Sequence, residues 1–325
     1  MLATAALLAA GCDEQQDSLA PRSHAAKDIA SLFWWMMGIS WFGIGLVVAL
    51  IMLAWRRAHT KRGHSVKEGE QLAFRIVIGA GIVMPIALIA ALFVISDILV
   101  IKTTQAPAAD ATRMTILVTG HQWWWQANYL GTTAVTANEI HIPVNTPVRV
   151  EVQTADVIHS FWVPRLNRTI DTMPGKRNAI ELYADAVGRY RGQCDEFCGL
   201  QHAHMGFYVF ADPPSVFRRW LARQEQPAKA PTGALAAQGA KLFQTSSCAS
   251  CHAIRGTAAS GDVGPDLTHV GSRTTLAALA IPNDPAHLAR WISDSQSIKP
   301  GNQMPNMNLS TGQVQALTAY LEGLR

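Results

Sequence analysis

The chain has 325 residues, which is enough for two or three domains of ordinary size. A hydrophobic fraction of 49% and a mean hydropathy of +0.11 are high for a protein that is soluble throughout. The net charge of only +4, without interleaved basic and aromatic residues, argues against a nucleic-acid-binding surface, so composition favours a membrane protein.

The first eleven residues, MLATAALLAAG, are apolar and end in small residues directly before Cys12. This pattern is typical of a secretory signal whose cleavage leaves a lipid-modified cysteine, so we expect a lipoprotein-like signal over 1–11 and lipidation of Cys12. The alternative is an ordinary cysteine within a cleaved peptide. Residues 12–30 are mostly polar and are expected to form a periplasmic tether.

Two long uncharged stretches follow, SLFWWMMGISWFGIGLVVALIMLAW (31–55) and IVIGAGIVMPIALIAALFVIS (76–96). Each reaches the roughly 20 apolar residues that a helix needs to cross a bilayer, whereas two buried helices of a soluble core are the weaker alternative. We therefore expect a transmembrane hairpin over 31–100, with helices at about 31–55 and 76–97. The segment between them is rich in arginine and lysine, which places it in the cytoplasm and both chain ends outside.

Beyond the membrane the sequence is rich in Val, Ile, Thr and aromatic residues, interrupted by Gly, Pro and Asn. Such short segments with turn signals between them favour a β-sandwich or barrel over a βαβ sheet. We expect this all-β domain to cover 101–222. Its clearest strand-like stretches are 113–130, 138–155, 178–184 and 206–211.

Residues 223–233, RQEQPAKAPTG, have the composition of a linker and are expected to stay unpacked. The stretches that begin at Ala234, Pro285 and Thr311 then have helical spacing and composition. The last part of the chain, 234–325, is therefore predicted to be a small all-α domain.

Four of the five cysteines form two close pairs, each with a histidine nearby, a pattern that indicates cofactors and not a disulfide framework. Cys248, Cys251 and His252 form the Cys-x-x-Cys-His motif of c-type haem attachment, in which the thiols bind the vinyl groups and the imidazole binds iron. Met304 and Met307 follow in a Pro/Gly-rich loop. Because thioether opposite imidazole is the cytochrome c arrangement, and Pro305 follows Met304, we expect Met304 to be the distal ligand.

The second cluster lies in GQCDEFCGLQHAHM (192–205), and a second histidine can come from DVIHSFWVP, which ends a predicted strand. Two thiolates and two imidazoles would suit zinc, but zinc has little use for a methionine. Thiolate, imidazole and thioether together favour copper. The candidate residues are His159, Cys194, Glu196, Cys198, His202 and Met205.

The stretches DVIHSFWVP, DTMPGKRN and GQCDEFCGLQHAHM resemble subunit II of haem-copper cytochrome c oxidases, and the preceding hairpin fits the same family. With a cytochrome c domain behind it, the chain from about residue 12 to 325 resembles the caa-type variant. The resemblance implies a multidomain architecture: a two-helix transmembrane hairpin, an all-β cupredoxin-like Greek-key domain and a small all-α class I cytochrome c domain.

The resemblance also implies site residues. A dinuclear CuA centre would be held by His159, Cys194, Cys198, His202, Met205 and the backbone carbonyl of Glu196. The Glu196 carboxylate would reach a magnesium ion at the boundary with subunit I, and electrons would enter at Trp123 of the GHQWWWQANY stretch. Trp124 stands where the family usually has tyrosine, and Asp195 where serine or alanine is commoner.

Other histidines are expected to be packed, exposed or bystander side chains and not ligands: His121, His141, His204, His269 and His287, of which the last two are expected at the surface of the haem domain.

The function implied is electron input to a respiratory terminal oxidase: one covalent haem c passes electrons to CuA, and CuA passes them to the catalytic haem-copper subunit I, which reduces oxygen to water with proton pumping. This chain would not reduce oxygen alone. Implied partners are subunits I and III, membrane lipid and an upstream cytochrome or quinol–cytochrome c reductase as donor, with no nucleic acid. The expected location is the bacterial inner membrane, with two passes and both redox domains on the periplasmic side.

Two alternatives remain open at this point. The same electron-input module could serve a nitric oxide reductase, because the difference lies in the catalytic partner. A copper-delivery assembly protein also uses a Cys-x-x-x-Cys pair and a histidine. Such proteins resemble thioredoxin, however, and lack residues matching His202 and Met205.

Overall fold

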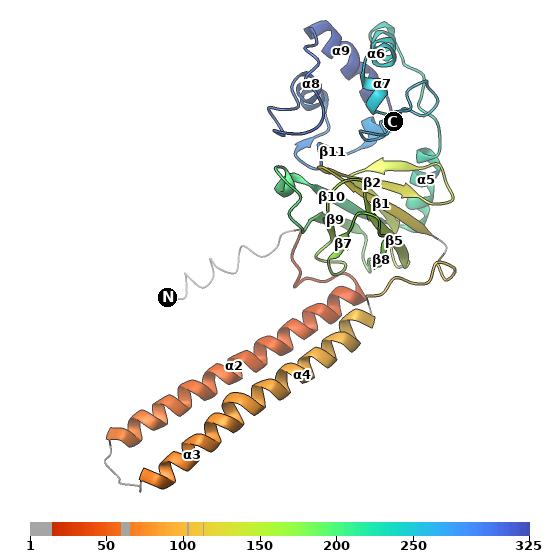
Figure 1. The fold of residues 1–325 in the computed structure, drawn as a ribbon. Helices are drawn as coiled ribbons and strands as arrows, with labels where there is room; N and C mark the ends of the chain where they lie inside the picture. Colours follow the sequence, from red (N-terminus) through yellow and green to blue (C-terminus); the bar gives the residue numbers. More distant parts are fainter. Residues whose placement is uncertain (1–14, 60–65, 103, 113) are drawn as a thin grey trace, which may run out of the picture. The chain divides into compact units, whose positions relative to one another are not determined.

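The computed structural model describes residues 15–59, 66–102, 104–112 and 114–325, so the signal-like segment and Cys12 lie outside the described residues. The chain divides into two compact units (Figure 1). One unit is His24–Thr104, and the other joins the residues up to Ser23 to Gln105–Arg325.

The first unit is a helical hairpin. Its helices are α2 (His24–His59), α3 (Val66–Ile78) and α4 (Met84–Ser96), with π-helical turns η1 (Gly79–Val83) and η2 (Asp97–Ile101). Two stretches of it, His24–Arg57 and Glu70–Ser96, are long and apolar enough to cross a membrane, as the sequence predicted. The first helix begins at His24, so the last residues of the expected tether are helical.

The β domain is a sandwich of two five-stranded sheets. One sheet has the order β3-β2-β1-β5-β8, and its strands are β1 (Thr115–His121), β2 (Trp124–Tyr129), β3 (Val135–Ala137), β5 (Val148–Thr154) and β8 (Asn178–Leu182). The other has the order β4-β10-β9-β6-β7, and its strands are β4 (Glu139–Pro143), β6 (His159–Trp162), β7 (Ile170–Thr172), β9 (Gly188–Cys194) and β10 (Gly206–Asp212). This confirms the cupredoxin-like fold class.

The core of the sandwich is aromatic and lies beside the second cysteine cluster. Trp125, Phe161 and Phe207 are fully buried, and Trp125 meets the other two rings edge-on at centroid distances of 5.7 and 5.6 Å. The alternation of buried and partly exposed residues along β2 and β5 is the period-2 pattern of a strand with one buried face. This rigid core fixes the strand ends from which the cluster residues project.

Part of the segment expected to form a periplasmic tether is bound to the β domain. The backbone N–H of Arg22 donates to Arg165 O at 2.8 Å, and the N–H of Asp185 donates to Arg22 O at 2.8 Å. Gln16 adds a side-chain bond of 2.7 Å to Gln193. These backbone bonds hold the chain against the sandwich up to the start of α2.

The last part of the chain is helical, which confirms the expected cytochrome c-like class. It contains α6 (Ala234–Thr245), α7 (Cys248–Cys251), a 3-10 turn η4 (Val270–Ser272), a small hairpin of β11 (Thr275–Leu276) and β12 (Ile281–Pro282), α8 (Pro285–Ser293) and α9 (Thr311–Glu322). Gly239 lets α6 approach α9 closely, because a Cβ there would lie only 1.9 Å from Ala316 O. Helix α9 begins with a capping box formed by Ser310 and Gln313.

The expectation of an unpacked linker is wrong for its first part, 223–228, whereas residues 229–233 are exposed. Its first residues end helix α5 (Pro214–Gln224), and the next ones are bound by the helical domain. Arg255 donates to the carbonyls of Gln224 and Gln226, while the N–H of Ala228 donates to Arg255 O at 2.8 Å. A polar, proline-containing composition indicates solvation in isolation, but here an arginine from the neighbouring domain satisfies the linker carbonyls.

Candidate haem and metal sites

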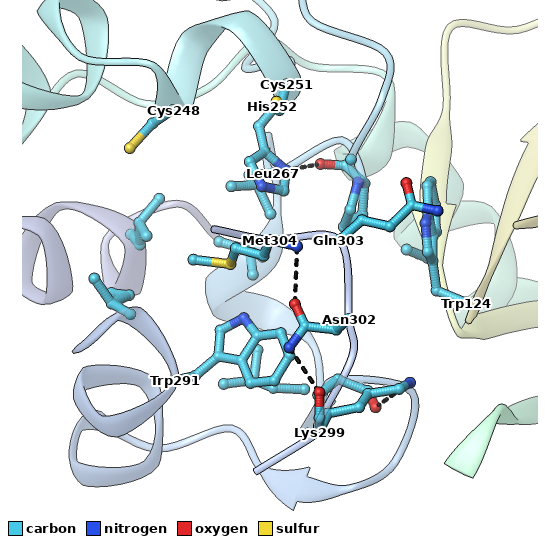
Figure 2. Close-up of a pocket in the computed structure, with 18 of the residues that line it drawn as sticks. Trp124, Cys248, Cys251, His252, Leu267, Trp291, Lys299, Asn302, Gln303 and Met304 are labelled. Carbon is cyan, nitrogen blue, oxygen red and sulfur yellow. Dashed lines mark hydrogen bonds between the residues drawn. The ribbon is translucent and has the colours of Figure 1, made fainter. Parts of the chain in front are cut away.

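A largely apolar cavity lies in the helical domain, beside the Cys-x-x-Cys-His motif. Cys248, Cys251 and His252 line it, together with Met304 of the later loop (Figure 2). Met307 of the same loop also lines the cavity. Its other walls are mostly aliphatic and aromatic side chains, among them Phe243, Leu267, Val270, Leu288, Trp291, Ile292, Leu317 and Leu321. Two attachment thiols, one imidazole and one or two thioethers around an apolar cavity fit a c-type haem.

His252 is held ready to bind iron through one nitrogen. Its Nδ1 lies 2.8 Å from Pro265 O, which braces the imidazole and leaves Nε2 for a metal. Burial lowers the pKa of His252, although the Pro265 carbonyl offsets part of the effect, so the imidazole is kept in the neutral, ligating form. Gly264 closes the other side: a Cβ there would lie 2.5 Å from His252 Cε1.

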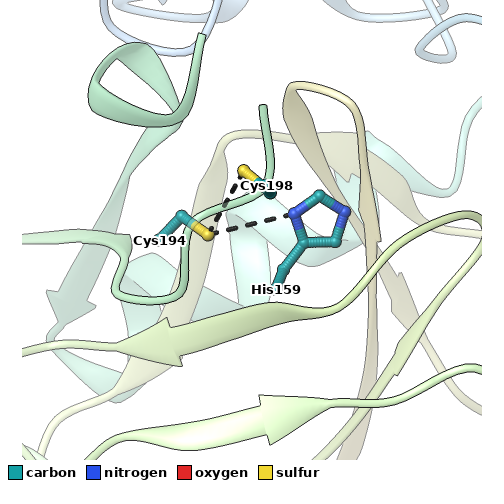
Figure 3. A group of neighbouring side chains, drawn as sticks. All are labelled: His159, Cys194 and Cys198. Atoms are coloured by element: carbon teal, nitrogen blue, oxygen red, sulfur yellow. Dashed lines mark hydrogen bonds between the residues drawn. The ribbon is translucent and has the colours of Figure 1, made fainter. Parts of the chain in front are cut away.

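The cysteine cluster of the β domain forms at the end of β9. Cys194 ends that strand, Cys198 lies in the loop that follows, and both are free and buried. Their sulfurs are 3.7 Å apart (Figure 3), well beyond the roughly 2.05 Å of a disulfide. That separation allows both sulfurs to bind the same ion at about 2.3 Å.

Two imidazoles approach the sulfur pair, one at each cysteine. His159 Nδ1 lies 3.9 Å from Cys194 Sγ, and His202 Nδ1 lies 3.7 Å from Cys198 Sγ. His159 begins β6, which lies beside β9 in the sheet, so strand pairing brings it to the cysteines. His202 lies in the same loop as Cys198, four residues further along the chain.

Two further soft or neutral donors complete the set. Met205 Sδ lies 3.7 Å from Cys198 Sγ, and Glu196 O lies 3.2 Å from Cys194 Sγ. Each cysteine therefore has one imidazole and one further donor beside it, a division suited to two ions that share the sulfurs. Thiolate, imidazole and buried thioether together are the donors that copper favours.

Asp156 is a functional residue that the sequence analysis missed. Its Oδ1 lies 2.8 Å from His159 Nε2, and its Oδ2 accepts from the N–H of Gln122 at 2.6 Å. Burial raises its pKa, but the hydrogen bonds from His159, Gln122 and Val157 outweigh burial, so the pKa of Asp156 is lowered. The carboxylate binds Nε2 and so directs His159 Nδ1 toward the sulfurs. A hydrogen bond to the other ring nitrogen orients metal-binding histidines in the same way.

Trp123 contacts both sites. Its indole Nε1 donates to Cys198 O at 3.0 Å, and the same residue lines the haem-type cavity together with Gln122 and Trp124 of the β domain. Trp124 stacks on His121 at a centroid distance of 4.2 Å. Trp123 and Trp124 of the β domain therefore contribute to the wall of the cavity that holds the Cys-x-x-Cys-His motif.

Of the other histidines, His204 is exposed and His287 is partly exposed, while three are packed. His121 stacks on Trp124, and His141 stacks between Phe210 and Trp220. His269, expected at the surface, is buried, and its Nε2 lies 3.0 Å from Gln226 O. The linker covers it, which the sequence did not reveal.

Comparisons with known proteins agree with this arrangement. Residues 132–211 match the family "Cytochrome C oxidase subunit II, periplasmic domain", and residues 236–325 match "Cytochrome c". Cytochrome c oxidase subunit 2 of Bacillus subtilis aligns with 27% identity over 100% of this chain and 96% of the relative. This chain belongs to the cytochrome c oxidase subunit II family. It is a family member with a C-terminal cytochrome c domain.

Two other relatives align with this chain over a smaller part of their own length. Cytochrome c oxidase subunit 2 of Alkalihalophilus pseudofirmus is 39% identical over 67% of this chain and 64% of the relative, and that of a Bacillus species is 32% identical over 69% and 66%. The chain thus spans about two thirds of the length of these relatives. Among solved structures, the periplasmic domain of subunit II from Bradyrhizobium japonicum matches with 31% identity and a TM-score of 0.34, over 36% of this chain and 95% of that one.

Family membership defines the cofactor classes. A subunit II domain implies CuA copper, a cytochrome c domain implies haem, and the residues described above fit both. Together with the two apolar helices, membership makes this a membrane protein with periplasmic domains.

Proposed function

We propose that this chain is the electron-input subunit of a respiratory terminal oxidase, in which electrons pass from haem c to CuA and then to a catalytic subunit I. The position of Trp123 is the main support for this proposal. Trp123 lines the haem-type cavity, and its indole N–H donates to the carbonyl of Cys198. A side chain that contacts both redox sites is suited to electron entry. This chain alone reduces no oxygen.

The proposed CuA centre holds two coppers. Its ligands are His159, Cys194, Cys198, His202, Met205 and the carbonyl of Glu196. The sulfur separation and the distribution of donors over the two cysteines support this set. A rigid sandwich core behind the ligands keeps them in place while the charge of the centre changes, so little rearrangement accompanies each transfer.

The proposed haem is one covalent haem c, bound by Cys248 and Cys251, with His252 as one iron ligand and Met304 as the other. The Pro265 brace on His252 and the apolar cavity support it. Met307 also lines the cavity, but its sulfur lies 3.5 Å from Ser247 Oγ. That contact favours Met304 as the ligand.

The surface beside the copper ligands suits a protein partner. Phe197 and Leu200 in the ligand loop are 76% and 80% exposed, which is unusual for large apolar side chains next to a site. The Glu196 carboxylate is exposed on the same loop and is available to a magnesium ion. We assign this surface to subunit I, in a bacterial inner-membrane complex that also contains subunit III and takes electrons from an upstream cytochrome or quinol–cytochrome c reductase, with proton translocation in subunit I.

Electron paramagnetic resonance of the copper-loaded full chain tests the proposed centre. One unpaired electron shared between two coppers should show hyperfine coupling to two equivalent nuclei. The signal of one isolated copper, or stoichiometric zinc in the purified protein, would contradict it. The catalytic subunit that co-purifies with the chain then separates an oxidase from a nitric oxide reductase.

A further inference from the structure

Lys299 is a buried lysine that joins the two redox domains. It belongs to the loop that carries Met304, it is only 3% exposed, and its Nζ donates to three backbone carbonyls. Two of them belong to the β domain, Trp123 O at 2.7 Å and His204 O at 2.8 Å, and the third is Ala277 O at 3.2 Å. The three donors of an ammonium group match these three acceptors.

The partners of Lys299 are residues next to the proposed redox ligands. Trp123 O belongs to the residue whose indole donates to Cys198 O, and His204 lies between His202 and Met205. The neighbouring Pro300 O accepts from Gln201 Nε2 at 2.7 Å. Two consecutive residues of the haem domain are thus bound to the copper-ligand loop, which we define as residues 195–205.

Inside the haem domain, the same lysine is connected to Met304 by a short series of hydrogen bonds (Figure 2). Asn302 Nδ2 donates to Lys299 O at 2.8 Å, and Asn302 Oδ1 accepts from the N–H of Met304 at 2.8 Å. Gln296 Nε2 donates to Met304 O at 3.0 Å. The Met304 loop, residues 295–304, is therefore braced by its own side chains and anchored at Lys299.

The third acceptor lies in a constrained part of the interface. Ala277, Ala278 and Leu279 all have positive φ, at 55°, 59° and 68°, a conformation that is costly for residues other than glycine. Leu279 Cδ1 lies 3.1 Å from where a Cβ on Gly206 would stand, so this segment packs directly behind Met205. Packing against the β domain and the bond from Lys299 hold it in place.

We propose that Lys299 is a positioning residue that fixes the Met304 loop against the copper-ligand loop and so sets one orientation of haem c for electron transfer to CuA. The inference rests on the proposed function of the two sites. It describes a haem domain docked on the β domain, and not one joined to it only by an unpacked linker. Two further contacts support docking: Glu139 accepts from the N–H of Thr274 at 2.7 Å, and Arg255 donates to Thr133 O.

The test compares Lys299→Met, which keeps the side-chain length, with Lys241→Met on an exposed position of α6 in the same domain. In the loaded full chain, Lys299→Met should slow haem-to-copper transfer about tenfold or more, because small misplacements have large effects on rate. The haem and copper spectra should stay unchanged. Lys241→Met should behave as the wild type, and equal transfer rates in the two variants would overturn the proposal.

Amide hydrogen exchange of the metal-free full chain gives a second readout that needs no cofactor. Exchange in residues 199–205 of the β domain should accelerate in Lys299→Met and not in Lys241→Met. Unchanged exchange, or faster exchange with an unchanged transfer rate, would overturn the positioning role. If Lys299→Met does not fold or does not bind its cofactors, Gln201→Ala can be used, because it removes the hydrogen bond to Pro300 O between the same two loops. It should also slow electron transfer and accelerate exchange. The proposal is overturned if it does neither. If the wild-type chain binds neither copper nor haem, the proposed function is wrong. Amide exchange in the metal-free chain still tests the contact between Lys299 and the copper-ligand loop.

Discussion

Replacing Gly264 by alanine tests how the haem domain holds its proposed iron ligand. The added Cβ would lie 2.5 Å from His252 Cε1 and 2.8 Å from its Nδ1. Ordinary carbon contacts begin near 3.5 Å, so the imidazole must move by about 1 Å. A shift of that size would break the 2.8 Å hydrogen bond from His252 Nδ1 to Pro265 O.

Overpacking of this kind costs about 2 kcal/mol of free energy. That cost lowers the equilibrium constant for iron ligation by His252 about 30-fold. Haem should remain attached, because its thioether bonds to Cys248 and Cys251 are covalent. Absorption and electron paramagnetic resonance spectra of the ferric protein should therefore show covalent haem with loss of the low-spin signal.

Gly312→Ala is the matched control, since a Cβ there meets nothing within 4 Å. It should leave the spectra unchanged and stabilise the first turn of α9 slightly, as alanine does relative to glycine in a helix. A Gly264→Ala protein with a wild-type low-spin spectrum would show that the close contact of Gly264 with His252 does not hold the imidazole in place.

Three other predictions follow from single contacts. Asp156→Ala should weaken copper binding about 10- to 100-fold in a copper titration, because it removes the hydrogen bond that orients His159, and unchanged affinity would contradict that role. Met304→Leu should abolish the weak far-red band of methionine-ligated ferric haem and lower its potential, whereas Met307→Leu should not, and the reverse result would exchange their roles. Ser310→Ala should lower the free energy of unfolding of the haem domain by about 1 kcal/mol in thermal melts, since it removes the N-cap of α9, and no change would show that the capping box is not stabilising.

Sequence spacing was sufficient where chemistry is local. The motif from Cys248 to His252 consists of residues close in the chain, and His202 and Met205 follow Cys198 within one loop. The period-2 pattern was also enough for β2 and β5. Strand β9 was missed because its buried face, Tyr190, Gly192 and Cys194, has only one large side chain, while its arginines lie on the opposite face.

Contacts between distant segments were not predictable in the same way. Lys299 stands in a Pro/Gly-rich loop, where a lysine is ordinarily solvated, and only the folded chain brings it to Trp123 O and His204 O. The linker bound by Arg255 was misjudged for the same reason, because its acceptors are backbone carbonyls that composition does not reveal. Asp156 lies only three residues before His159, but its contact with the N–H of Gln122 joins segments far apart in the chain.

The most direct test of the account is to photoreduce haem c in the intact, copper-loaded chain and follow the oxidation of haem and the reduction of CuA together. We expect first-order transfer with a rate independent of protein concentration, because Trp123 contacts both sites within one chain. A rate that rises in proportion to protein concentration would mean that the haem delivers its electrons to another molecule, and would contradict the proposed path from haem c to CuA.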